Sequence, residues 1–301
     1  MNDREIPSQK PLYTPLYSTE SGGNRLNLIQ WIVCFICIEL VWTFLGGAST
    51  TLFSELTRNR SWSTYSWVIY LNQHINFVVL FGSIFVFVRY ILRIPLRTFI
   101  TQAPRFRWKL FRFSLFVWLV GVSIATLITA LIEPQAIMLY RTPRIWDRLT
   151  LMILALLFTP LQCIAEELLF RTYVWRMMEG RIKKFWIPGV ISGLIFTLAH
   201  LTNSELQSTN YSVFVLFYYF LTGFLFMEMT RIHGGSEAAF GAHIANNLFL
   251  VFIINYAGSS LPSDSWFIQQ NPIIWLDLVV LSLCSACIIW MGKHKRFSSD
   301  S

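Results

Sequence analysis

The sequence predicts an all-α membrane protein with about eight transmembrane helices and both termini in the cytoplasm. Three observations support this prediction. Of the 301 residues, 54% are hydrophobic and only 13% are charged, whereas about a quarter of the residues in a typical soluble domain are charged. Eight apolar segments approach or reach the ~20 residues that a membrane helix needs. The Lys and Arg residues gather between alternate segments, as the positive-inside rule requires.

The eight predicted helices are apolar runs bounded by polar or charged residues. They are Leu26–Gly46, Trp67–Val88, Trp108–Ile132, Leu149 to about Met178, Trp186–Leu201, Tyr211–Thr230, Glu237–Ala257 and Ile273–Gly292. The fifth is short, and we expect it to extend into its flanks. The loops between the segments are too short for an independent core. Residues 26–292 are therefore expected to form a single transmembrane helical domain.

The basic residues predict the orientation in the membrane. If the amino terminus is cytoplasmic, 19 of the 24 Lys and Arg residues fall on the inner side and 5 fall in outer loops. A missed helix would scramble this asymmetry, so it also supports an even number of helices. Topology thus accounts for the net charge of +8, and no nucleic-acid partner is expected.

The two ends of the chain are polar. Residues 1–25 carry mixed charge together with Pro7, Pro11 and Pro15, a composition typical of disordered segments. This arm is too long for the charged region that begins a cleaved signal peptide. We therefore expect a disordered cytoplasmic arm at 1–25 and a short cytoplasmic tail at 293–301.

Two adjacent carboxylates lie inside the fourth predicted helix. An ionisable side chain at membrane depth costs roughly a few kcal/mol, so such residues tend to be functional. Glu166 and Glu167 point about 100° apart on a helix and cannot share one direction. Arg171 follows Glu167 by four residues, in the favourable acid-first order. We expect Arg171 to hold Glu167 while Glu166 faces a site; the alternative is an ion pair at a helix end.

Two later helices each carry a histidine. His200 closes the fifth predicted helix, and Phe196 lies one turn earlier on the same face. His243 and Asn247 are four residues apart and share a face of the seventh helix. The alternatives are an interfacial histidine at a helix end for His200 and simple interhelical hydrogen bonding for His243.

These residues can meet only if the fourth helix is long. If it ended at Phe170, Glu166 would lie near the inner surface and could not reach His200. If it continues to Arg176, Glu166 lies ~15 Å from the inner end, and His200 lies ~20 Å along its own helix. We therefore predict a long fourth helix and a site near mid-bilayer, reachable from the cytoplasmic side.

The three sequence runs together carry a family resemblance. They are Glu166-Glu167-x-x-x-Arg171, Phe196-x-x-x-His200 and His243-x-x-x-Asn247, in this order on separate late helices. Over about Leu149–Ala257, the expected catalytic core 149–257, the chain resembles the CPBP intramembrane proteases (CAAX protease and bacteriocin-processing, or Abi, family), also called type II CAAX prenyl endopeptidases. The first three helices carry no matching motif. Family members often have glycine at the position of Thr172, a departure that we expect to leave the helix straighter and to remove no catalytic group.

The resemblance implies an intramembrane endopeptidase that cleaves near the C-terminus of a hydrophobic or lipidated, CAAX-like peptide, or of a peptide precursor. By carry-over from the family, Glu166 and His200 activate a water molecule. His243 and Asn247 stabilise the oxyanion of the tetrahedral intermediate. The supporting residues are Glu167, Arg171 and Phe196. Peptide hydrolysis needs such a base, a proton for the leaving amine and donors for the oxyanion.

Zinc is the mechanistic alternative. Two histidines and a carboxylate with an open position form a zinc-hydrolase ligand set, here His200, His243 and Glu166. However, the chain lacks an H-E-x-x-H helix, and an asparagine one turn from His243 suits an oxyanion hole better. We therefore expect no cofactor, with zinc-dependent metalloendopeptidase activity as the rival mechanism.

Two other functions are compatible with the sequence. One is a non-proteolytic scaffold or bacteriocin-immunity protein of the same fold. The other is a proton-coupled transporter that uses Glu39, His74 and the polar run 72–76. Glu39 and His74 could instead share a hydrogen bond between neighbouring helices, or could line the substrate entry. The expected partners are the lipid bilayer and a peptide or lipidated protein, in a bacterial cytoplasmic membrane or, for a eukaryotic chain, the endoplasmic reticulum.

Overall fold

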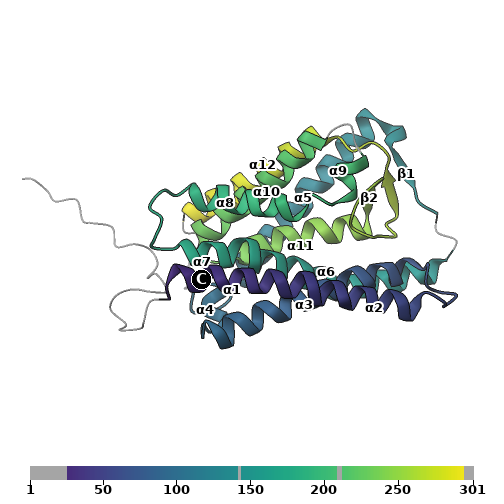
Figure 1. The fold of residues 1–301 in the computed structure, drawn as a ribbon. Coiled ribbons are helices and arrows are strands. Elements are labelled where there is room, and N and C mark those ends of the chain that lie inside the picture. The colour runs from purple at the N-terminus through teal and green to yellow at the C-terminus, as the bar shows by residue number, and fades with distance from the viewer. Residues whose placement is uncertain (1–25, 142–143, 209–211, 295–301) are drawn as a thin grey trace, which may run out of the picture.

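The structure, a computed structural model, describes residues 26–141, 144–208 and 212–294 as a helical bundle (Figure 1). The amino-terminal arm 1–25 and all but the first two residues of the tail 293–301 lie outside the described residues. Within the described part, helices run back and forth along one axis, with a small sheet at one end.

The first half of the chain forms three long helical stretches and one short helix. Its elements are α1 (Leu28–Val41), a π-helical turn (Trp42–Gly46), α2 (Gly47–Thr57), α3 (Ser66–Val86), a second π-helical turn (Phe87–Ile91), α4 (Leu96–Ile100) and α5 (Trp108–Ile132). The π-helical turns do not interrupt the helices, so Leu28–Thr57 and Ser66–Ile91 each run on as one stretch.

The second half contains the residues of the sequence motifs. Its helices are α6 (Ile145–Glu167), a third π-helical turn (Leu168–Tyr173), α7 (Val174–Met178), α8 (Ile187–Ala199), α9 (Ser204–Ser208), α10 (Ser212–His233), α11 (Glu237–Phe252) and α12 (Ile274–Lys293). The stretch Ile145–Met178 is continuous over 34 residues. The predicted long fourth helix, which continues past the carboxylate motif, is therefore confirmed.

Each of the eight predicted segments contains a helix in the described part of the chain. Six described stretches are long and apolar enough to cross a membrane: Leu28–Thr57, Ser66–Ile91, Trp108–Ile132, Ile145–Met178, Val213–His233 and Ile274–Gly292. α8 and α11 are shorter, with 13 and 16 residues. The chain is thus an all-α polytopic membrane protein, whereas the count of eight spans and the cytoplasmic placement of both termini stay predictions.

Several predicted boundaries were wrong; the fourth helix, for example, begins at Ile145 rather than at Leu149. The first helix continues to Thr57 instead of ending at Gly46, and hydroxyls in its polar stretch bond back to helix carbonyls, as Ser49 does to Leu45. The seventh ends at Phe252 rather than Ala257 and leads into a strand. The fifth spans only Ile187–Ala199 and does not extend into its flanks.

A three-stranded sheet, which the sequence analysis did not predict, lies at the end of the bundle away from the start of α1 (Figure 1). The strands are β1 (Ile137–Leu139), β2 (Ile254–Tyr256) and β3 (Phe267–Gln269), in the order β1-β3-β2. β3 pairs antiparallel with β1 and parallel with β2. The sheet thus joins the segment that follows α5 to the segment between α11 and α12. We call the end of the bundle that carries this sheet the strand end.

Glycines allow the helices around the motifs to approach closely. A Cβ atom on Gly223 of α10 would lie 2.6 Å from the Cα atom of Gly193 in α8. A Cβ atom on Gly241 of α11 would overlap the carbonyl oxygen of Phe111 in α5. Small residues at such crossings are how membrane helices gain close packing without a hydrophobic driving force. α8 and α11, which carry the two motif histidines, are therefore held at fixed distances from α10 and α5.

We predict that Gly223→Ala lowers the thermal stability of the protein in detergent, because the added methyl group would force α8 away from α10. Overpacking of this kind costs about 1–3 kcal/mol. Gly82→Ala is the matched control, since a Cβ at Gly82 meets nothing within 4 Å. Equal melting temperatures for the two variants, measured by intrinsic fluorescence, would contradict this packing.

Candidate active site

The Glu167 carboxylate joins two of the three motifs. Its Oε2 lies 3.2 Å from Nε of Arg171, and its Oε1 accepts a hydrogen bond of 2.8 Å from Nδ1 of His243. The side chains of Glu167 and Arg171 are fully buried. The predicted pairing of Arg171 with Glu167 is confirmed, and the bond to His243 adds a link between α6 and α11 that the spacing did not indicate.

The Arg171 guanidinium lies between aromatic rings. Its central carbon is 4.0 Å from the ring centre of Phe196 and 5.6 Å from that of Phe226. Its terminal nitrogens have no hydrogen-bond acceptor among the described residues, so the ring faces compensate part of the buried positive charge. This contact explains why a phenylalanine stands one turn before His200: it packs on the arginine of another motif.

Glu166 faces away from that ion pair, as predicted. Its Oε1 accepts a hydrogen bond of 3.1 Å from Nε2 of Gln162, and its Oε2 lies 3.9 Å from Nε2 of His243. The sequence analysis did not assign a role to Gln162. Its position four residues before Glu166, on the same helix face, is the signal that could have identified it.

The His200 side chain is fixed in one tautomer by its neighbours. Nδ1 lies 2.7 Å from the carbonyl oxygen of Phe196, and a carbonyl only accepts, so Nδ1 carries the hydrogen. In the neutral ring, Nε2 is then unprotonated and able to take a proton. The ring packs against Phe196 and Tyr219, with centroid distances of 4.2 and 4.5 Å.

A short hydrogen-bond relay orients Asn247. The indole Nε1 of Trp118 in α5 donates to Oδ1 of Asn246 at 3.2 Å, and Nδ2 of Asn246 donates to Oδ1 of Asn247 at 3.1 Å. An indole N–H can only donate, which sets the orientation of both amides. The amide nitrogen of Asn247 is thereby left to donate to another group. No sequence pattern pointed to Trp118.

One cavity of about 410 Å³ brings the motif residues together. Glu166, His200, His243 and Asn247 all line it, and its volume is in the range of ligand pockets. The cavity continues toward the strand end, with lining residues from β2, β3 and the start of α12. The placement of the four side chains agrees with the predicted site, and access from the cytoplasmic side stays a prediction.

Comparison with known proteins supports the resemblance. Residues 145–249 match the family model of the type II CAAX prenyl endopeptidases, described as Rce1-like. Residues 145–249 are therefore similar to this family, and we call them the Rce1-like domain. A relative from Bacillus subtilis (strain 168), the uncharacterized protein YyaK, is 28% identical over 236 residues, which cover 76% of this chain and 77% of the relative. No solved structure matches the chain.

All four expected catalytic residues fall within the Rce1-like domain, which supports an intramembrane endopeptidase in general. Thr172, where family members often have glycine, follows Arg171 in the third π-helical turn. The helix is therefore locally widened at this position, and the straighter course that we expected stays a prediction. The Thr172 hydroxyl lies 2.6 Å from that of Ser236 and 3.3 Å from the carbonyl oxygen of Glu167. Thr172 thus ties the motif helix to the start of α11.

The expected hydrogen bond between Glu39 and His74 is not among those of the described residues. His74 instead donates from Nδ1 to the carbonyl of Tyr70 at 2.7 Å and stacks on its ring. From the same polar run, however, Gln73 and Asn76 line the cavity. This part of α3 therefore contributes to the wall of the Rce1-like site rather than to a separate path.

The alternative zinc ligands do not form a ligand set in this arrangement. Among the described residues, no three His, Cys, Asp or Glu side chains lie together as a group that could hold a metal ion.

We predict that Arg171→Leu strongly destabilises the Rce1-like domain, because it leaves the Glu167 carboxylate buried without its cation. Breaking a buried pair in this way costs about 3–5 kcal/mol. A second substitution, Glu167→Gln, is expected to restore part of the lost melting temperature in detergent. The control is Arg58→Leu, since Arg58 pairs with Glu55 at a largely exposed site; a loss in this variant as large as in Arg171→Leu contradicts the assignment.

Proposed function

We propose that the chain hydrolyses a peptide bond within the membrane by a metal-free mechanism. In this proposal Glu166 and His200 activate water, and His243 and Asn247 stabilise the oxyanion. The observation that carries it is the convergence of these four side chains, from α6, α8 and α11, on one cavity. The match of residues 145–249 to an endopeptidase family supports the same reaction class.

The water-activating step needs a base and a route for its proton. Glu166 has one oxygen held by Gln162 and a second oxygen directed toward His243. Because Nδ1 of His200 carries the hydrogen that bonds to the Phe196 carbonyl, Nε2 of the neutral ring is unprotonated and can accept a proton. As water attacks the scissile carbonyl, its proton passes to this pair. The pair then returns the proton to the leaving amine as the carbon–nitrogen bond breaks.

The oxyanion needs donors that are already in place. The Trp118–Asn246 relay leaves the Asn247 amide nitrogen as a donor. Nδ1 of His243 donates to Glu167, so Nε2 donates to an oxyanion only when the ring carries both protons. The two neighbouring carboxylates compensate the positive charge of that ring. Donors of fixed orientation in a site that excludes water supply much of the rate enhancement in such reactions.

The proposed substrate is a hydrophobic or lipidated CAAX-like peptide, or a peptide precursor, cut near its C-terminus. Aromatic side chains make up part of the cavity wall, among them Trp42, Phe77 and Phe170. Such walls suit an apolar chain that approaches from the surrounding bilayer. A non-proteolytic scaffold has no need of a base and oxyanion donors in one cavity, so proteolysis is the favoured function.

We predict that Glu166→Gln lowers kcat by about 10²–10⁴-fold, the range for loss of a general base, while KM changes little. The measurement is cleavage of a library of fluorogenic peptides, prenylated and non-prenylated, by purified protein in detergent. Glu39→Gln is the matched control, because Glu39 also lies at membrane depth but does not line the cavity.

The same assay distinguishes the mechanisms. Cleavage that is insensitive to a strong zinc chelator, and is lost in both Glu166→Gln and His200→Ala, agrees with the metal-free proposal. Cleavage that the chelator abolishes and added zinc restores contradicts it. Absence of cleavage by the wild type throughout a diverse library favours the scaffold function.

We predict that Trp118→Phe lowers kcat without a matching loss of stability. The decrease is expected to be smaller than that caused by Asn247→Ala, which removes the oxyanion donor itself and should lower kcat by roughly 10²–10³-fold. Phenylalanine keeps the ring but removes the N–H that orients the two amides. Trp146→Phe serves as the control, because Trp146 is 77% exposed and lies outside the cavity. A kcat equal to that of the wild type in Trp118→Phe rules out the relay.

A further inference from the structure

One wall of the cavity carries a carboxylate that the proposed mechanism does not use. Asp277 lies in the first turn of α12 and lines the cavity, as do Val280 and Leu281 of the same helix. Residues at this spacing share one helix face, so Asp277 belongs to the face that α12 turns toward the cavity. Its carboxylate is surrounded by protein, while the residue is exposed. The exposed surface of Asp277 is therefore surface of the cavity.

The Asp277 carboxylate has no partner in the described part of the chain, where it accepts no hydrogen bond and forms no ion pair. The other two carboxylates of the cavity are occupied. Glu166 accepts a hydrogen bond from Gln162, and Glu205 accepts one of 3.0 Å from the backbone nitrogen of Ser260. Carboxylates within membrane-spanning segments are almost always paired, because an isolated charge there is costly. The carboxylate on α12 is thus left for a ligand.

No basic side chain of the described residues is placed to neutralise Asp277. The two motif histidines are the only basic residues in the described lining of the cavity, and both are held within the catalytic group. At the strand end, the buried Arg148 pairs with Asp264 at 3.5 Å and donates to the carbonyl of Tyr140 at 2.7 Å. Arg148 does not line the cavity.

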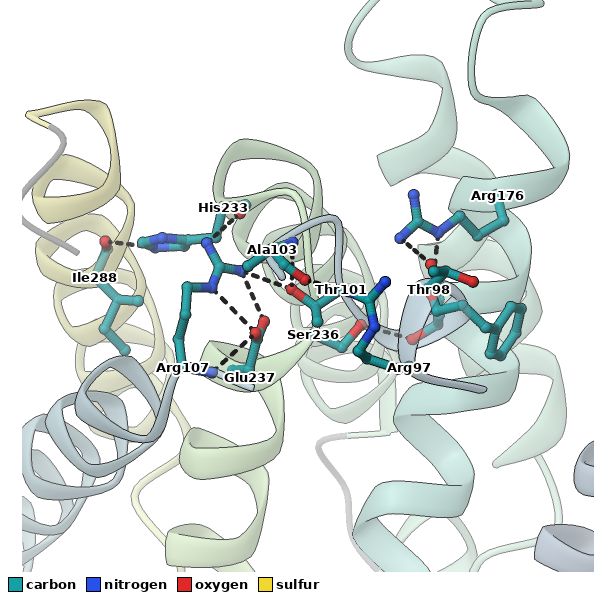
Figure 2. A network of polar contacts seen from close by, with 12 residues as sticks. Arg97, Thr98, Thr101, Ala103, Arg107, Arg176, His233, Ser236, Glu237 and Ile288 are labelled. Atoms are coloured by element: carbon teal, nitrogen blue, oxygen red, sulfur yellow. Dashed lines mark hydrogen bonds and ion pairs between the residues drawn. The ribbon is translucent and has the colours of Figure 1, made fainter. Parts of the chain in front are cut away.

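The buried arginines at the opposite end of the bundle are also engaged (Figure 2). Arg107 donates from Nη2 to Oε2 of Glu237 at 2.7 Å, and Arg176 donates to the carbonyl of Thr98 at 2.8 Å. These contacts help to pack the segment 101–107 over that end, and neither arginine lines the cavity. The positive charge that the unpaired carboxylate lacks must therefore come from a ligand.

Two tyrosines stand near this carboxylate. Tyr218 and Tyr256 both line the cavity, and Asp277 acts electrostatically on the hydroxyl groups of both. The face of an aromatic ring attracts a cation, and a carboxylate forms charge-assisted hydrogen bonds with ammonium and guanidinium groups. A carboxylate with tyrosine rings beside it has the chemistry that binds a cationic group.

Helix α10 relates this group to the catalytic residues. Tyr218, Thr222 and Phe226 follow one another at one-turn spacing and all line the cavity. The Phe226 ring packs against that of His243, with their centroids 6.2 Å apart. Eight residues of helix separate Tyr218 from Phe226, which corresponds to ~12 Å. An extended peptide covers this distance in about three or four residues.

We propose that Asp277, Tyr218 and Tyr256 form a subsite for a cationic side chain of the substrate, a lysine or an arginine. This side chain lies about three or four residues from the scissile bond. The inference deepens the proposed function and rests on it for the position relative to the cleaved bond. The substrate is then a hydrophobic peptide that carries a basic residue near the cleavage site.

The test compares fluorogenic peptides that carry either lysine or the uncharged norleucine at successive positions on both sides of the cleaved bond. The purified protein is kept in an uncharged detergent. We expect lysine at the third or fourth residue to raise kcat/KM at least about tenfold in the wild type, the effect of one charge-assisted contact. Asp277→Asn should abolish this preference, and Asp277→Lys should replace it with a preference for glutamate.

Glu133→Gln is the matched control for the loss of a carboxylate. Glu133 is exposed at the strand end but does not line the cavity, so this variant should keep the lysine preference. Equal kcat/KM values of the wild type for the lysine and norleucine peptides at every position overturn the inference. The cleavage observed in that case leaves the proposed function intact.

A binding measurement covers the case in which no peptide is cleaved. Fluorescence anisotropy of the same labelled peptides is recorded with the Glu166→Gln protein. We expect the lysine peptide to bind at least about tenfold more tightly than the norleucine peptide, and the added Asp277→Asn substitution to remove the difference. Equal binding overturns the subsite. Lysine-dependent binding without cleavage by the wild type supports the subsite and counts against the proposed hydrolysis.

Discussion

The buried carboxylate of Glu167 is the constraint on which the site depends. It lies at membrane depth with no exposed surface, and its two oxygens contact Arg171 and His243. A buried charge persists only if it is paired and hydrogen-bonded, because desolvation costs roughly several kcal/mol per ion. One interaction therefore fixes a side chain of α11 relative to α6. The position of Glu166 relative to His243 follows from it.

The π-helical turn Leu168–Tyr173 is the local backbone feature that accompanies this pair. Single π-turns inside α-helices often occur at functional sites. Here the turn directly follows Glu167 and contains Arg171. The hydroxyl of Thr172 donates to the Glu167 carbonyl and contacts Ser236, so the widened turn is also attached to the neighbouring helix. The geometry that presents Glu166 to the cavity is held from both sides.

Helix periodicity explains what could be predicted from the sequence. The division of roles between Glu166 and Glu167 depends only on angles within one helix, as does the pairing with Arg171. The long fourth helix followed from requiring His200 and Glu166 to lie at one depth. The fold class followed from composition, and the helix positions followed from the apolar runs.

Features that depend on contacts between distant segments could not be predicted in the same way. Trp118 reaches Asn246 across 128 residues of sequence, and the strands pair segments that surround separate helices. The direction of the cavity depends on which end the loops close, and the segment 101–107 gave no signal that it packs over one end. The contact between the Phe196 ring and Arg171 likewise depends on how α6 and α8 are placed relative to each other, which the sequence does not show.

The state of the His243 ring tests the central claim most directly. Nitrogen-15 NMR of histidine-labelled protein in lipid nanodiscs reports which ring nitrogen carries hydrogen, and the His243 signals are identified by their loss in His243→Gln. The bond to Glu167 predicts a protonated Nδ1 whose resonance shifts strongly in Glu167→Gln. An unprotonated Nδ1, or a resonance that Glu167→Gln leaves unchanged, would contradict the view that this carboxylate organises the site.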